Sequence, residues 1–115
     1  MPNKTFEVKT YEVSVGYKNA TIFNNVTIQI QGMLVGKGAA GERLIVYGLH
    51  PSSPVPPNAF CNWAVKIGSI FVPFAVLGQY VDILRNEKPV NARIDSDHPE
   101  WMAFSTGSES VGEGE

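Results

Sequence analysis

A chain of 115 residues, 43% of them hydrophobic and 17% charged, has the size and composition of one globular domain. The formal net charge is −2, and without the glutamates at 109, 113 and 115 nine basic side chains face eight acidic ones. This balance excludes a strongly basic nucleic-acid surface and a strongly acidic one. With no signal pattern and no long apolar run, we expect a cytoplasmic protein without membrane association.

The first 32 residues predict two long strands that bend. Apolar residues alternate from Lys4 to Gly16 but change parity near residues 9–10, so we expect a β-bulge there. Residues 17–20 are turn-like, and residues 26–30 show the most regular alternation in the chain. The parity slips again at Gly32, which predicts a second bulge or bend.

Gly36, Gly38 and Gly41 match the G-x-G-x-x-G pattern of nucleotide-binding loops. In dinucleotide-binding domains such a loop opens a helix, because the helix N–H groups hold the pyrophosphate. Here the following residues, 42–49, are typical of a strand. We therefore expect a flexible hairpin loop rather than a phosphate-binding one, and no cofactor.

Four prolines between residues 51 and 57 predict a stiff, extended surface loop. We interpret it as a crossover connection in preference to a ligand for a proline-recognising domain. Alternation resumes over residues 60–74, either as two short strands with a tight turn at Gly68-Ser69 or as one strand kinked at Gly68.

From Phe74 to Asn86 the apolar period becomes that of an amphipathic helix. Pro73 suits its first turn and Pro89 prevents its continuation. Gly78 inside the helix predicts close packing against the sheet or a partner.

The C-terminal part predicts a short strand at 90–94, a turn in "SDHPEW" capped by Ser96 or Asp97, and a last strand from Trp101 to Phe104. We expect one β-rich domain over residues 1–105 and a disordered acidic tail over 106–115. The predicted fold is mainly β, all-β to α+β. It is a bent antiparallel sheet or a small barrel resembling the oligonucleotide-binding (OB) architecture, with one amphipathic helix near 74–86.

Catalysis has one candidate constellation, because Cys61 is the single cysteine and His50 and His98 are the only histidines. Asp95 or Asp97 would orient the base. No signature surrounds Cys61, which we interpret as a small buried hydrophobe. A small enzyme that uses Cys61 with a histidine is an alternative hypothesis, and a metal site is not expected.

Our main hypothesis is a non-catalytic protein-interaction or assembly module that forms homo-oligomers. It depends on the apolar richness of residues 60–84, which exceeds what one small core is expected to bury. The candidate interface residues are Phe71, Phe74, Leu77, Tyr80, Val81, Leu84 and Trp101.

An alternative hypothesis is single-stranded nucleic-acid binding by an OB-like fold, in which aromatic side chains stack on bases and lysines follow the backbone. Without the three C-terminal glutamates the chain has a net charge of +1, which supports nucleic-acid binding only weakly. The candidate residues are Tyr11, Tyr17, Lys18, Lys37, Tyr47, Trp63 and Lys66, with Lys9 beside them.

Overall fold

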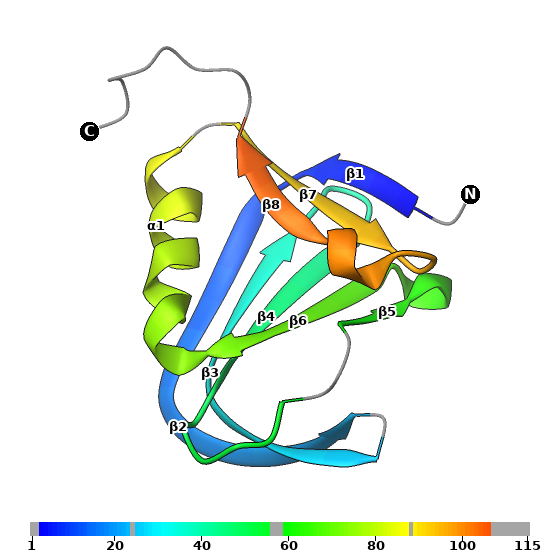
Figure 1. Cartoon of the computed structure of the whole chain (residues 1–115). Coiled ribbons are helices and arrows are strands. Elements are labelled where there is room, and N and C mark those ends of the chain that lie inside the picture. Colours follow the sequence, from blue (N-terminus) through cyan, green and yellow to red (C-terminus); the bar gives the residue numbers. More distant parts are fainter. Residues whose placement is uncertain (1–2, 24, 56–58, 88, 107–115) are drawn as a thin grey trace.

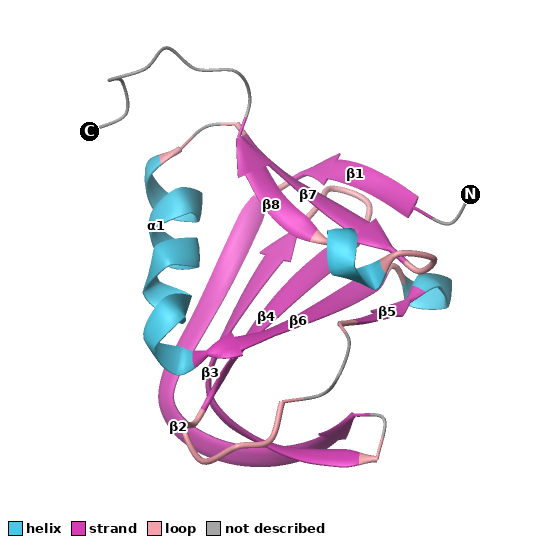
Figure 2. Ribbon diagram, in the orientation of Figure 1, coloured by secondary structure: helices cyan, strands magenta, loops and turns pink. Residues whose placement is uncertain are grey.

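Two β-sheets and one helix make up the fold (Figures 1 and 2). The computed structural model describes residues 3–23, 25–55, 59–87 and 89–106, without the side chains of residues 17–19 and 23. The larger sheet has the order β2-β3-β4-β6-β5, formed by Thr10–Phe23, Val26–Lys37, Arg43–Leu49, Ile67–Pro73 and Phe60–Asn62. The smaller sheet has the order β1-β7-β8, formed by Asn3–Glu7, Val90–Asp95 and Ala103–Thr106. The helix α1 is Leu77–Asn86, and short 3-10 turns occupy η1 (Trp63–Val65), η2 (Phe74–Val76) and η3 (Pro99–Trp101).

The predicted mainly-β fold with one helix is confirmed in its bent-sheet form. Every strand pair of the described chain is antiparallel except β4 and β6, which are parallel. The sheets do not close into a barrel, because β2 and β5 remain edges of the larger sheet and β1 and β8 of the smaller one. The parallel pair requires the connection from residue 50 to 66 to cross over, as expected for the proline loop, of which residues 56–58 lie outside the described chain.

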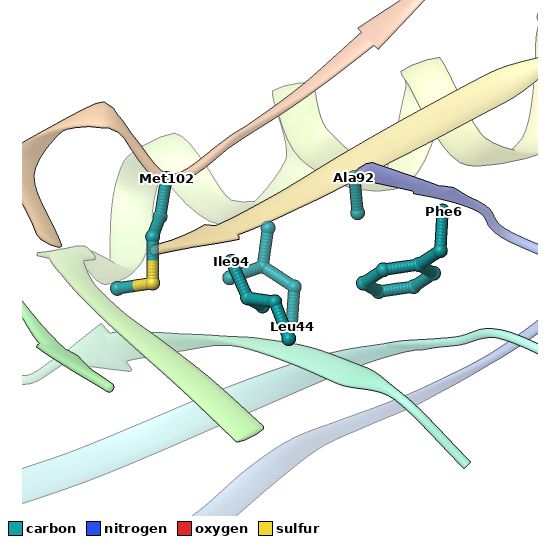
Figure 3. Packing of buried hydrophobic residues seen from close by; sticks show 5 residues of the cluster. All are labelled: Phe6, Leu44, Ala92, Ile94 and Met102. Atoms are coloured by element: carbon teal, nitrogen blue, oxygen red, sulfur yellow. The ribbon is translucent and has the colours of Figure 1, made fainter. Parts of the chain in front are cut away.

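One face of the larger sheet, which we call the front face, is covered by α1 and the smaller sheet. A cluster from both sheets fills the space between them, as Figure 3 shows; it contains Phe6, Leu44, Ala92, Ile94 and Met102. A second cluster lies under α1 and contains Leu34, Val46, Leu77, Leu84 and Val90. The helix predicted over residues 74–86 is thus confirmed, with a 3-10 first turn, and so is the strand at 90–94.

The N-terminal alternation belongs to two strands rather than to one bulged strand. β1 ends at Glu7 and pairs with β7, whereas β2 begins at Thr10 and pairs with β3. At the junction the N–H of Lys9 donates to the carbonyl of Lys37, the register partner of Thr10, at 2.8 Å. The bend was predicted at the right place, but the parity changes because the chain leaves one sheet for the other.

The predicted turn at residues 17–20 is wrong, because β2 continues through these residues to Phe23. The irregularity there is a register shift between Val15 and Asn19, at which Gly16 adopts a φ of +84°. The second predicted irregularity, at Gly32, is confirmed by a register shift between Ile30 and Gly32 in the β3–β4 pairing.

The turn expected at Gly68-Ser69 lies earlier, over residues 63–66, where Lys66 adopts a left-handed φ of 58°. Gly68 instead lies within β6 on the front face. A Cβ there would stand 2.5 Å from Sδ of Met102 and 3.0 Å from Ile94, so any larger residue would force these side chains to shift. Gly78 was expected to pack closely, yet a Cβ at this position would meet nothing within 4 Å.

Candidate functional site

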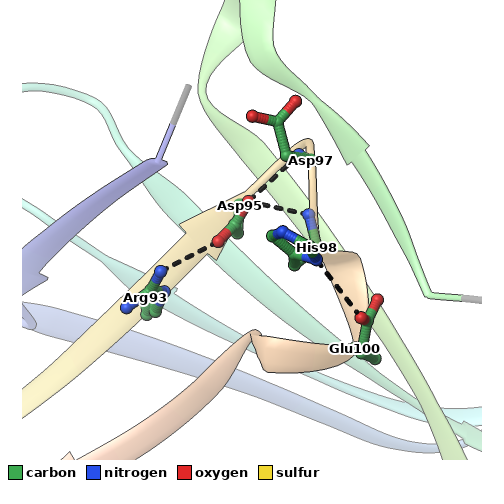
Figure 4. A network of polar contacts seen from close by, with 5 residues as sticks. All are labelled: Arg93, Asp95, Asp97, His98 and Glu100. Carbon is green, nitrogen blue, oxygen red and sulfur yellow. Dashed lines mark hydrogen bonds and ion pairs between the residues drawn. The ribbon is translucent and has the colours of Figure 1, made fainter. Parts of the chain in front are cut away.

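A polar network gathers at the end of β7 around Asp95, a buried carboxylate (Figure 4). Its Oδ2 accepts a hydrogen bond from the Arg93 guanidinium at 2.9 Å. Its Oδ1 accepts the N–H groups of Asp97 at 3.0 Å and His98 at 2.9 Å. The turn is therefore capped, and the side chain that accepts the N–H groups of Asp97 and His98 is that of Asp95, which was not among the predicted caps.

The protonation of Asp95 follows from these contacts. Burial alone would raise its pKa, but the N–H of His98, the guanidinium of Arg93 and the N–H of Asp97 together hold the pKa below its ordinary value. The carboxylate is therefore ionised at neutral pH and keeps Arg93 in place. Arg93 carries the positive charge to the surface, since its side chain is 38% exposed.

Arg93 lies over Trp101, an exposed aromatic residue in the turn that follows β7. The Trp101 ring is 53% exposed and stacks on the His98 ring, with centroids 3.9 Å apart. The Arg93 guanidinium carbon lies 5.6 Å from the centroid of Trp101. The His98 ring also faces the Glu100 carboxylate at 3.5 Å. A tryptophan with a cation on its face is thus presented to solvent.

A second aromatic and cationic pair lies in η1. Nζ of Lys66 stands 4.0 Å from the centroid of the Trp63 ring and donates to the carbonyl of Trp63 at 3.2 Å. The left-handed backbone of Lys66 turns its side chain back over that ring. In Figure 1 the short helical turns η1 and η3 are drawn at the same end of the fold. Cys61 in β5 lies near Asp95, which precedes η3, and near Lys66, which follows η1, because both residues affect the pKa of its thiol. We call Trp63, Lys66, Arg93, His98 and Trp101 the aromatic end.

The thiol of Cys61 is half-buried and packs against the cluster between the sheets. Burial raises its pKa and is the largest effect. The N–H of Asp95 lowers the pKa in turn, and the smaller effects of the Asp95 carboxylate, which raises it, and of Lys66, which lowers it, follow. Asp95 does lie near Cys61, as the enzyme hypothesis requires. The histidines are engaged elsewhere, because Nδ1 of His50 pairs with Oγ of Ser52 at 2.8 Å and the His98 ring stacks on Trp101.

The nucleic-acid candidates do not share one surface. Trp63 and Lys66 lie together at the aromatic end, whereas Lys37 pairs with Glu12 at 2.7 Å beside β2. Tyr11 lines a cavity at the start of β2, described below. Tyr47 stacks on Phe71 with centroids 5.6 Å apart, on the other face of the larger sheet. The side chains of Tyr17 and Lys18 lie outside the described part of the chain.

The interface candidates are mostly enclosed by the chain itself. Leu77 and Leu84 of α1 are buried against the larger sheet. Four others are half-buried and pack on the second or third apolar cluster: Phe71, Phe74, Tyr80 and Val81. Trp101 is the exposed member. The large apolar side chains that the structure exposes are Val13, Val15, Ile22, Val55, Phe60, Val65 and Trp101.

Two of these exposed side chains form an apolar row on β2. Tyr11, Val13 and Val15 point to the front face, because Val13 and Val15 are register partners of Leu34 and Gly32, beneath α1. Val13 is 39% and Val15 60% exposed. Since β2 is an edge strand, the apolar layer under α1 continues to the rim of the sheet and ends there uncovered. We call Tyr11, Val13 and Val15 the β2 row.

A cavity of about 370 Å³ lies at the start of this row. Residues 7–11, at the junction of β1 and β2, form one side, and Leu84, Glu87, Pro89 and Val90 form the other. No sequence pattern predicts this cavity, because it forms where the chain passes from one sheet to the other beside the end of α1.

The loop between β3 and β4, residues 38–42, contains a buried carboxylate, that of Glu42. Glu42 is 3% exposed, and its Oε1 accepts the N–H of Ala40 at 3.0 Å while its Oε2 pairs with Nζ of Lys4 at 2.6 Å. The hydrogen bond from Lys4 holds the pKa of Glu42 below its ordinary value. A Cβ at Gly38 would collide with this carboxylate and with Phe6. The loop joins β3 and β4 as a hairpin, as predicted, and its glycine at 38 makes room for Glu42.

No protein-family model matches this chain, and neither curated proteins nor solved structures provide a match. Among the described residues, no helix is both long and apolar enough to cross a membrane. Within the same ranges, no three histidine, cysteine or acidic side chains are grouped as ligands for a metal ion.

Proposed function

We propose that this protein is a non-catalytic association module that binds protein chains, copies of itself included, along the β2 row. One observation carries the proposal. The edge strand β2 exposes Val13 and Val15 on the front face of the larger sheet, whereas α1 covers the same face at the neighbouring strand β3. Edge strands that expose apolar side chains favour strand addition, in which a partner pairs with the backbone and covers the side chains.

The proposal moves the interface away from the apolar segment at residues 60–84. Most of its large apolar side chains pack against β3 and β4 in the second cluster. They are therefore largely buried within the chain and leave little apolar surface for a partner. The area left for a partner lies beside it, where the β2 row meets the cavity at residues 7–11. A partner side chain that enters this cavity would add specificity to backbone pairing.

Two measurements on the full chain test this function. Sedimentation equilibrium over a wide range of concentrations measures self-association, and capture from a lysate of its own cells on the immobilised protein measures binding to other chains. Val15→Glu places a charge in the β2 row and is expected to weaken whichever association occurs, whereas Ile22→Glu changes an equally exposed side chain at the far end of β2. A chain that stays monomeric and captures no protein would overturn the proposal.

A second candidate function is binding of single-stranded nucleic acid at the aromatic end, favoured by the two tryptophans that each carry a cation. Stacking on exposed aromatic side chains and contact of cations with phosphates are the two parts of such binding. The small number of cations there argues for weak affinity, because the affinity depends on the phosphates that are neutralised.

A further inference from the structure

We propose that two copies of this chain pair antiparallel along the first part of β2, with Val13 of each copy opposite Val13 of the other. This inference rests on the proposed function and names its partner as a second copy of the chain. The strand segment concerned is Thr10–Val15, which is regular up to the positive φ of Gly16 and the register shift that follows.

The sequence on both sides of Val13 is symmetric in its chemistry. Residues 11 and 15 are apolar and residues 12 and 14 are polar. A two-fold axis through Val13 therefore sets Tyr11 opposite the partner's Val15 and Glu12 opposite the partner's Ser14. Apolar pairs across strands are stabilising, and no two like charges meet.

The neighbouring registers are less favourable. An axis through Glu12 would place two carboxylates directly opposite each other, which destabilises an antiparallel pair. An axis through Ser14 would bring Gly16 and the irregular residues after it into the pairing. The axis through Val13 keeps all pairs from residue 11 to 15 within the regular part of the strand.

The segment also lacks the features that keep edge strands apart. It contains no proline and no lysine, and its one charge, on Glu12, is already paired with Lys37 at 2.7 Å. Pairing would cover Val13 and Val15, which are 39% and 60% exposed, and would join the apolar layers of two front faces at the rim of each sheet.

Disulfide formation tests the register on the full chain. In a Cys61→Ser background, Val13→Cys is compared with Val15→Cys and Ile22→Cys under mild oxidation. Opposed residues of an antiparallel pair have Cβ atoms about 5 Å apart, so Val13→Cys should form the covalent dimer at least about tenfold faster than the other two. The two Val15 positions are about 13 Å apart in this register, four residues along the strand.

Sedimentation equilibrium tests the surface independently. Val13→Lys sets two ammonium groups opposite each other and should raise the dissociation constant of the dimer by about tenfold or more. Ile22→Lys adds the same charge at an exposed position outside the pairing and should leave it unchanged. Both positions are exposed, so circular dichroism should show folded protein in each case.

The outcomes separate this inference from the proposed function. Self-association that Val13→Lys leaves unchanged overturns both proposals, because Val13 belongs to the β2 row. A monomer that captures another protein through the β2 row overturns this inference and leaves the function standing. Faster cross-linking of Val15→Cys than of Val13→Cys overturns the register. A monomer without any partner overturns both proposals.

Discussion

The guanidinium of Arg93 pairs at 2.9 Å with the carboxylate of Asp95, two residues later on the same strand and the same face. The carboxylate is buried while the guanidinium reaches the surface. The same carboxylate caps the turn that presents His98 and Trp101. Asp95 thus connects the core of the protein to its aromatic end.

The stability should fall in acid because of Asp95. Its folded pKa lies below the unfolded value of about 3.9, so its stabilising effect is complete above that pH and is lost as the pH falls through the folded pKa. Asp95→Asn should lower the free energy of unfolding at neutral pH, and its difference from the wild type should shrink in acid. Urea denaturation at a series of pH values measures both. Asp97→Asn, at an exposed carboxylate, serves as the control, and equal pH profiles for the wild type and Asp95→Asn would contradict the prediction.

Cys61 should react slowly in the folded protein. Burial raises the pKa of its thiol, so less thiolate is present at neutral pH than in an exposed cysteine. We expect labelling by a thiol reagent to be about tenfold or more slower in the native state than after denaturation. The Cys61→Ser variant gives the background rate. Equal rates in the two states would show an accessible, activated thiol and would favour the enzyme hypothesis.

Two glycine substitutions should have opposite signs. Gly68→Ala forces a Cβ against Met102 and Ile94 between the sheets and should destabilise the protein by about 1–3 kcal/mol. Gly78→Ala meets nothing within 4 Å in the first turn of α1 and should stabilise it by about 0.5–1 kcal/mol. Thermal or urea unfolding measures both. A loss of stability in Gly78→Ala would mean that a surface not seen in the single chain packs there.

The aromatic end should bind a single-stranded oligonucleotide if the second candidate function is correct. Tryptophan fluorescence should then be quenched at low salt. Two cations that contact phosphates predict a slope of about −1.4 for the logarithm of affinity against that of salt concentration. Trp63→Phe and Trp101→Phe identify the ring that stacks. Lys66→Ala removes one cation and should therefore make the salt dependence of the affinity shallower. No quenching at low salt would remove this function.

The helix and most strands were predictable because their signals are local. The change of period at Phe74 and the proline at 89 define α1 from residues within it or next to it. The turn at residues 63–66 was missed because Lys66 adopts a positive φ without the usual glycine or asparagine. Gly68 resembles a turn residue in the sequence, but in the structure it lies within β6, where the side chain of Met102, which is distant in sequence, leaves little room for a Cβ.

The candidate sites depend on contacts that single segments do not contain. An edge strand and a central strand have the same alternation, so the exposure of Val13 and Val15 required the strand order. The role of Arg93 was not predicted, because its contact with Trp101 joins different elements. Its i, i+2 spacing from Asp95 in a predicted strand does place both residues on one face. Trp63 and Lys66 were both among the predicted nucleic-acid candidates, but their contact with each other and their neighbours in η3 were not predicted.

The order of strands in the smaller sheet has a consequence for synthesis. β7 lies between β1 and β8, with Asn3 opposite Asp95, so β1 has no partner strand until residues 90–95 have been made. Until β7 leaves the ribosome, Phe6 and the front face of the larger sheet lack their cover. Pairing across so long a stretch of chain is slow, because loop closure precedes the gain from contacts. The cluster between the two sheets therefore cannot close in the nascent chain until β7 has been made, and until then the apolar side chains of β1 and of the front face stay open to aggregation.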